Sequence, residues 1–160
     1  METNDDILHR YESVSFESVH RPILHRLPKR QLKIIDIGSG SGRDSGYLAR
    51  QGHCVRAVEP NAHYRTEAAR LHPSPLIDWA DDRLPNLAKT VQQNERYDIV
   101  LISAVWMHLD QDERCIAMPI VAGLLNPTGL LVITLRHGSK SRPLRMFEVS
   151  SPETKALAAA

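Results

Sequence analysis

The sequence has little cysteine, no histidine cluster and no long apolar run, and each shortage excludes a class of protein. The two cysteines, Cys54 and Cys115, lack Cys-x-x-Cys spacing, so we expect free thiols in a reducing compartment. The eight histidines form no His-x-x-x-His pair, so we expect no metal site. No window approaches the roughly 18 apolar residues of a membrane span, and the acidic first residues are unlike a signal peptide. These absences predict a cytoplasmic protein with no membrane partner.

A large net charge is also absent. The formal net charge is +1 at pH 7, which provides no general attraction to nucleic acid or to an anionic membrane. Apolar residues make up 42% and charged residues 24% of the chain, a balance typical of globular proteins. A chain of 160 residues is long enough for one domain with a single hydrophobic core.

Short apolar runs alternate with helical patterns along the chain. We expect strands at residues 32–37, 54–58, 99–103 and 130–135, with a weaker one at 75–79. We expect helices at residues 45–50, 62–71, 84–93 and 110–125. The last helix has a capping box at Asp110 and Glu113, and Pro119 should kink or split it. The alternation predicts an α/β fold, a Rossmann-like doubly wound, mostly parallel sheet with helices on both faces.

The same alternation divides the chain into three parts. Residues 1–31 contain a helical stretch at 17–27 and predict either a lid over the site or an edge helix packed on the sheet. Residues 32–137 form the core, and residues 138–160 form a C-terminal loop and the start of a helix. Because so little follows the fifth strand, we expect a truncated fragment whose final strands are missing. The fifth strand would then be an apolar edge, available for pairing in a homodimer.

A glycine loop directly after the first strand is the most informative stretch. It reads Asp-Ile-Gly-Ser-Gly-Ser-Gly-Arg over residues 36–43. Alternating glycines let the backbone turn sharply and approach a ligand closely. A dinucleotide-binding loop of the type G-x-G-x-x-G would need a glycine where Arg43 stands. An acid at Asp36 suits a cationic ammonium group and would be poorly placed beside a pyrophosphate.

The position of Glu59 favours a nucleoside as ligand, because this acid ends the second strand 19 residues after Gly40. An acid at this spacing accepts hydrogen bonds from ribose hydroxyls. The ordered loop and acid resemble class I S-adenosylmethionine-dependent methyltransferases, and the resemblance extends over about residues 32–136. The stretches 97–103 and 124–133 resemble that family's fourth strand and the turn and fifth strand after it, although Thr128 departs from the usual Pro-Gly-Gly turn.

The resemblance implies S-adenosylmethionine as cofactor, with S-adenosylhomocysteine as product. The implied cofactor-binding residues are Tyr11, Asp36, Gly38, Ser39, Gly40, Gly42, Arg43, Glu59, Pro60, Asp81, Asp82 and Ser103. The candidates for the adenine amino group are Asp78, Asp81 and Asp82, of which the resemblance favours Asp81 or Asp82 before Leu84-Pro85. Tyr11 belongs to the lid.

The expected reaction is methyl transfer to a small molecule at oxygen, nitrogen or sulfur. His108, after the fourth strand, is the candidate catalytic base, because an imidazole exchanges protons near neutral pH. The alternative for His108 is a structural histidine. The sequence lacks the Asp-Pro-Pro-Tyr, Asn-Pro-Pro-Tyr and Pro-Cys motifs of base-modifying enzymes, so no nucleic-acid partner is indicated. Two other functions stay open, namely a non-catalytic cofactor-binding module or partner subunit and an NAD-dependent oxidoreductase.

Overall fold

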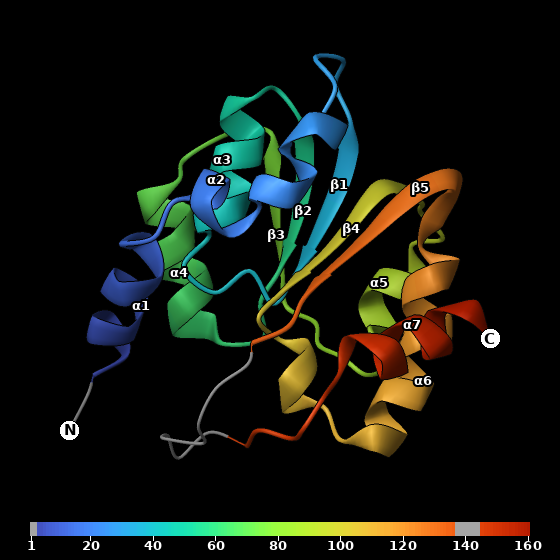
Figure 1. Cartoon of the computed structure of the whole chain (residues 1–160). Helices are drawn as coiled ribbons and strands as arrows, with labels where there is room; N and C mark the ends of the chain where they lie inside the picture. The colour runs from blue at the N-terminus through green and yellow to red at the C-terminus, as the bar shows by residue number, and fades with distance from the viewer. Residues whose placement is uncertain (1–2, 137–144) are drawn as a thin grey trace.

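The computed structural model describes residues 3–136 and 145–160. Within these ranges five parallel strands form one sheet in the order β3-β2-β1-β4-β5 (Figure 1). The strands are β1 (Lys33–Ile37), β2 (Cys54–Val58), β3 (Ile77–Ala80), β4 (Tyr97–Ser103) and β5 (Leu125–Thr134). The chain order reverses between β1 and β4, so the carboxyl ends of these neighbours form a topological switch point. The prediction of a Rossmann-like, doubly wound parallel sheet is confirmed.

Helices cover both faces of the sheet (Figure 1). One face carries α2 (Phe16–Val19), the 3-10 helix η1 (Arg21–Arg26), α3 (Arg43–Arg50) and α4 (Ala62–Leu71). The other carries α5 (Ala88–Gln92), α6 (Gln111–Gly123) and α7 (Ser151–Ala159). Successive strand residues point to opposite faces, so Ile34 and Ile35 enter different apolar clusters. None of the described helices is long and apolar enough to span a membrane.

Helix α6 begins with the predicted capping box. The Asp110 N–H donates to Glu113 Oε2 at 2.9 Å, and the Glu113 N–H donates to Asp110 Oδ1 at 2.9 Å. Of the two expected effects of Pro119, a kink or a split, the split is wrong, because α6 continues unbroken to Gly123. Proline leaves the carbonyl four residues earlier without its helical donor. That residue, Cys115, is exposed, so water can satisfy the carbonyl.

Two expected helices are shorter than the sequence pattern predicted. The stretch 84–93 yields only α5 (Ala88–Gln92), since Leu87 adopts a left-handed backbone conformation with φ of 45°. The stretch 17–27 divides into α2 and η1, because His20 leaves helical geometry and Pro22 starts the second piece. The positive φ at Leu87 is incompatible with an α-helix, so α5 cannot extend back through this residue.

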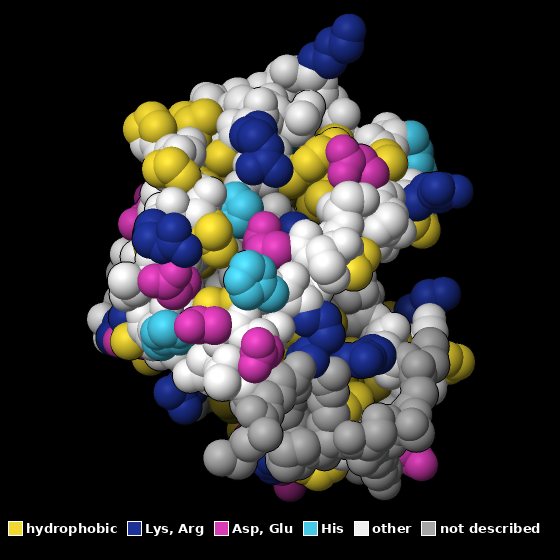
Figure 2. Space-filling model, turned by 90° about the vertical axis from the view of Figure 1, so that its left-hand side faces the viewer, with side chains coloured by type: hydrophobic (Ala, Val, Ile, Leu, Met, Phe, Trp, Pro, Cys, Tyr) yellow, Lys and Arg dark blue, Asp and Glu magenta, His cyan; other side chains and the backbone are white. Residues whose placement is uncertain are grey.

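The N-terminal segment is part of the folded core. Its first helix, α1 (Asn4–Glu12), lies beside α4 (Figure 1). His63 Nε2 lies 2.9 Å from Asp5 Oδ1, and His72 Nε2 lies 3.1 Å from Glu12 Oε1. Histidine and acidic side chains accordingly gather on this face of the molecule (Figure 2). These pairs connect α1 to α4.

The C-terminal residues also pack against the core. The Ser150 hydroxyl accepts from the Glu153 N–H at 3.2 Å and caps α7. Val149 and Leu157 pack against the cluster beneath α6. Strand β5 pairs with β4 alone among the described strands. The predicted boundary at residue 137 lies outside the described residues, and the three-part division stays a prediction.

Phe16 provides a test of how firmly the N-terminal segment is packed. It is 2% exposed and its ring stacks on Tyr47 with centroids 4.2 Å apart. We predict that Phe16→Ala lowers the free energy of unfolding by about 3 kcal/mol or more, because the truncation leaves a cavity. Val14→Ala, at a position that is 43% exposed, should change it by less than about 0.5 kcal/mol. Denaturant unfolding measures both, and equal effects would contradict this packing.

Candidate cofactor and acceptor site

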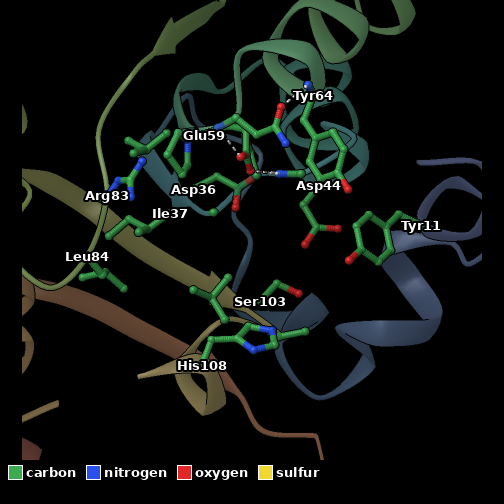
Figure 3. Close-up of a pocket in the computed structure, with 18 of the residues that line it drawn as sticks. Tyr11, Asp36, Ile37, Asp44, Glu59, Tyr64, Arg83, Leu84, Ser103 and His108 are labelled. Atoms are coloured by element: carbon green, nitrogen blue, oxygen red, sulfur yellow. Dashed lines mark hydrogen bonds between the residues drawn. The ribbon is translucent and has the colours of Figure 1, made fainter. Parts of the chain in front are cut away.

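One cavity of about 630 Å³ opens at the carboxyl ends of β1, β2 and β4. Its volume is in the range of pockets that bury a small organic ligand. Asp36 and Glu59 lie on one side of it, Ser103 and His108 on the other, and Tyr11 enters from α1 (Figure 3). The predicted residues that line the cavity are Tyr11, Asp36, Gly38, Ser39, Gly40, Arg43, Glu59, Pro60, Asp82, Ser103 and His108.

The glycine loop crosses from β1 to α3 under the cavity. The N–H groups of Gly38 and Ser39 donate to the Val58 carbonyl at 2.8 and 3.0 Å. Gly38 and Gly40 have φ of 77° and 56°, a region that strongly favours glycine. The Ser39 hydroxyl oxygen is buried and has no hydrogen-bond partner in the described part of the chain. An orphaned hydroxyl in a cavity wall is a group that a polar ligand would satisfy.

Glu59 joins the glycine loop to the end of β2. Its Oε2 accepts the Gly40 N–H at 2.9 Å, and its Oε1 accepts the Asn61 N–H at 2.8 Å. Burial raises the pKa of the Glu59 carboxyl, and these two hydrogen bonds act in the opposite direction. Each carboxylate oxygen can accept a further donor. Glu59 can therefore hold the loop and still receive hydroxyl groups from a ligand.

Asp36 is a second buried carboxyl in the cavity wall. It is 1% exposed, and its Oδ2 accepts the Ser45 hydroxyl at 2.7 Å. Burial, reinforced by the negative charge of Asp44, raises the pKa of Asp36 to about 7. A cationic ligand group would offset both effects and favour the charged carboxylate.

The buried Asp44 carboxyl links the start of α3, directly after the glycine loop, to the N-terminal segment. Asp44 Oδ2 lies 2.8 Å from His20 Nε2, and Asp44 Oδ1 accepts from Arg43 Nε at 2.8 Å. Burial acts to raise the pKa of Asp44, but these partners lower it below its usual value. Arg43 also donates to the Tyr11 carbonyl at 3.2 Å. Arg43 thus fixes the end of α1 beside the glycine loop.

Two predicted residues do not line the cavity. A Cβ on Gly42 would lie 2.7 Å from Trp79 and 3.0 Å from Ala68, so Gly42 permits close packing of the loop against α4 and β3. Asp81 points to solvent and pairs with Lys89 at 2.9 Å. Asp82 is buried, but its oxygens accept the N–H groups of Arg83 and Thr90 at 2.9 and 2.8 Å. Of the two favoured adenine candidates, only Asp82 lies in the cavity wall.

The opposite end of the cavity follows β4. Ala104 has φ of 56°, and its N–H donates to the Thr134 hydroxyl at 2.8 Å. This bend leads into η2 (Trp106–His108), which brings His108 to the cavity. His108 Nδ1 lies 2.7 Å from the Arg145 carbonyl oxygen. A carbonyl oxygen only accepts, so in the neutral ring Nδ1 carries the hydrogen and Nε2 carries the lone pair.

Several lining residues were not identified from the sequence. Asp44 and Asn61 carry local signals, because an acid in the first turn after a glycine loop and an Asn after a strand-ending acid are typical of helix starts. Tyr64 lies one turn into the helix that Asn61 caps. Met146 also lines the cavity, and no sequence pattern indicated it. The described ranges contain no group of side chains that could hold a metal ion.

Comparison with known proteins supplies the family. Residues 35–133 match the family model described as a methyltransferase domain. This match covers more than half of the chain. The chain belongs to the methyltransferase domain family. The predicted resemblance is therefore confirmed for the region that contains the glycine loop, Glu59 and strand β4.

The methyltransferase domain also has individual relatives. It is 34% identical over 118 residues to the ubiquinone biosynthesis O-methyltransferase of Rhodopseudomonas palustris strain BisA53, covering 69% of this chain and 42% of that protein. The chain thus spans less than half the length of this curated relative. A TehB-like SAM-dependent methyltransferase from Corynebacterium glutamicum matches with a TM-score of 0.75 and 22% identity, covering 98% of this chain and 80% of that one.

A further structural neighbour was solved with both ligands in place. It is the 1,6-didemethyltoxoflavin-N1-methyltransferase of Burkholderia thailandensis with bound 1,6-didemethyltoxoflavin and S-adenosylhomocysteine. The match has a TM-score of 0.70 and 23% identity, and covers 98% of this chain and 74% of that one. At this identity the likeness supports the fold of the methyltransferase domain.

A substitution at Gly40 tests whether the glycine loop binds the ligand. A Cβ there would lie 3.5 Å from the Tyr11 ring, inside the cavity wall, and would require a positive φ. We predict that Gly40→Val abolishes S-adenosylhomocysteine binding, measured by isothermal titration. Gly123→Ala is the control, because outside its own helix and chain neighbours no atom of the described residues lies within 4 Å of its added Cβ. Equal losses of binding in both variants would indicate a general loss of folding.

The raised pKa of Asp36 should make the stability of the fold depend on pH. Its pKa of about 7 in the folded chain exceeds the usual value of 3.8, so the folded protein keeps a proton that the unfolded chain releases. The resulting stabilisation is complete below about pH 4 and is lost as the pH rises through 7. The side chain in Asp36→Asn is neutral at both pH values. Between pH 4 and pH 8 the free energy of unfolding of this variant should therefore rise by more than about 1 kcal/mol relative to that of the unsubstituted protein.

Urea unfolding at both pH values measures this gain. Glu148→Gln is the control, because it neutralises an acid at an exposed position. A pH-independent difference between Asp36→Asn and the unsubstituted protein would contradict the buried, protonated carboxyl.

Proposed function

We propose that the chain binds S-adenosylmethionine in this cavity and transfers its methyl group to a small-molecule acceptor. The observation that carries the proposal is the Glu59 carboxylate, which holds the Gly40 N–H at 2.9 Å and has lone pairs left for ribose hydroxyls. The cavity residues fit this cofactor. The orphaned Ser39 hydroxyl and the buried Asp36 carboxyl offer an acceptor and a negative charge to its amino-acid end.

Methyl transfer requires little side-chain chemistry when this cofactor is bound, because its sulfonium already provides an activated methyl group and a good leaving group. The protein's task is to align the acceptor and to exclude water. Tyr11 and the glycine loop would cover the cofactor, and Asp82 would lie near the adenine. His108 Nε2 would remove a proton from the acceptor.

A hydroxyl is the acceptor group that we favour. The curated relative is named an O-methyltransferase, and a neutral imidazole is a suitable base for a phenol-like hydroxyl near neutral pH. N-methylation of a ring compound, as named for the Burkholderia neighbour, is the alternative. A screen of phenols, ring amines and thiols with labelled methyl donor distinguishes these acceptor classes. Label transferred to none of them would favour a non-catalytic cofactor-binding module.

The outer edge of β5 supports a further proposal about partners. This strand pairs on one side only within the described ranges, and Leu130, Leu131 and Ile133 are partly exposed. An unpaired apolar edge favours pairing with another strand, so we propose a homodimer across β5. Sedimentation of the unsubstituted protein tests it: a dimer supports pairing across β5, and a monomer at every concentration rejects it. Cytoplasmic location stays a prediction from the sequence.

The cofactor class is tested directly by isothermal titration with S-adenosylhomocysteine and with NAD. We expect saturable binding of S-adenosylhomocysteine for two reasons. The strand before the loop provides the Asp36 carboxyl, and Arg43 stands where a dinucleotide-binding loop has its third glycine. Binding of NAD alone would favour the oxidoreductase, and binding of neither ligand would reject the proposal.

Glu59 provides the residue-level test. We predict that Glu59→Ala weakens S-adenosylhomocysteine binding by about 1.5–3 kcal/mol, the range for hydrogen bonds to a charged group. The substitution also removes the acceptor of the Gly40 N–H in the loop and of the Asn61 N–H at the start of α4, so the effect should reach the upper end. Glu67→Ala, which removes a carboxylate paired with Arg70, should leave the affinity unchanged. Normal affinity in a folded Glu59→Ala protein would reject the ribose assignment.

A further inference from the structure

We propose that Arg145 is a positioning residue that fixes the tautomer of His108 and thereby leaves Nε2 free as a base. This inference rests on the proposed function only for the use of that nitrogen. The tautomer itself is a property of the free protein and can be measured without any substrate.

The capping box of α6 provides the anchor for Arg145. Glu113 Oε2 and Asp110 Oδ1 are used within the box. The other two oxygens, Glu113 Oε1 and Asp110 Oδ2, accept from the Arg145 guanidinium at 3.1 and 2.7 Å. The two carboxylates therefore start the helix and hold Arg145 at the same time.

The backbone of Arg145 holds His108. Its carbonyl oxygen lies 2.7 Å from His108 Nδ1. The partner of one imidazole nitrogen decides which nitrogen carries the proton, and this partner can only accept. The neutral ring therefore has its hydrogen on Nδ1, while His108 lies in the cavity wall.

Neighbouring contacts hold the same short segment. The Phe147 N–H donates to the Met107 carbonyl at 2.8 Å, directly before His108. The buried Arg114 donates to the Glu148 carbonyl at 3.1 Å and pairs with Glu153 at 3.2 Å. These contacts hold residues 147 and 148, whereas the ion pairs of the Arg145 guanidinium with Asp110 and Glu113 hold the residue whose carbonyl contacts His108.

We expect Arg145 to be replaceable without unfolding of the chain. Its side chain is 57% exposed, and exposed ion pairs contribute little to stability. The pairing can also be weakened from the other side by combining Asp110→Asn with Glu113→Gln. Both replacements keep hydrogen-bonding groups for the capping box and remove the charges that hold the guanidinium.

The decisive experiment is long-range ¹H–¹⁵N NMR of the imidazole, with and without S-adenosylhomocysteine. We expect the Nδ1–H tautomer to dominate in the unsubstituted protein above pH 8. Arg145→Ala and the double variant should both move most of the population to Nε2–H. Arg145→Lys should restore part of the original tautomer, and Arg70→Ala, which removes an exposed pair with Glu67, should change nothing.

Activity gives a second readout. With an acceptor from the screen, Arg145→Ala should lower kcat at least tenfold, while the acceptor KM and the Kd for S-adenosylhomocysteine stay within about twofold. An Nε2–H ring in the unsubstituted protein, or an unchanged tautomer in Arg145→Ala, would overturn the inference. Absent S-adenosylhomocysteine binding would instead reject the proposed function and leave the tautomer result valid.

Discussion

The hydrogen bond between the Glu59 carboxylate and the Gly40 N–H connects the ends of two neighbouring strands. Strand β1 ends in a loop whose glycines take positive φ values, and that loop has few side chains of its own to hold it. Glu59, directly after β2, provides a side-chain anchor at 2.9 Å, beside the Val58 carbonyl that accepts from Gly38 and Ser39. The start of α3, the exposure of Asp36 to the cavity and the placement of Ser39 all depend on the path of this loop. The Glu59 carboxylate, which positions the loop, can also accept hydrogen bonds from a ligand in the cavity.

The two ends of the chain complete the cavity on opposite sides of this loop. Helix α1 reaches the glycine-loop side of the cavity through Tyr11 and is held there by Arg43. The segment after β5 reaches the other side, where Met146 joins the wall and Arg145 contacts His108. The sheet therefore provides the middle of the site, and sequence far from the glycine loop determines how each end is shaped.

Local patterns predicted the sheet and the centre of the site, because both depend on neighbouring residues. Strands β1, β2 and β4 are nearly continuous apolar runs, and the glycine loop with Glu59 is a spacing that can be read directly. Strand β5 begins at Leu125, earlier than expected, because pairing with β4 extends through a register shift near Tyr97. Gly42 was assigned to the cofactor, whereas its missing side chain accommodates α4 and β3. Arg145 depends on tertiary contacts over more than thirty residues, and no local pattern encodes them.

The most direct measurement is an amide NMR titration of the ¹⁵N-labelled protein with S-adenosylhomocysteine. We predict saturable shifts of the Gly38, Ser39, Gly40 and Glu59 amides at a common Kd, while the Gly123 amide stays unmoved. Saturable shifts that leave the amides of Gly40 and Glu59 unchanged would contradict the claim that their hydrogen bond forms the cofactor cradle.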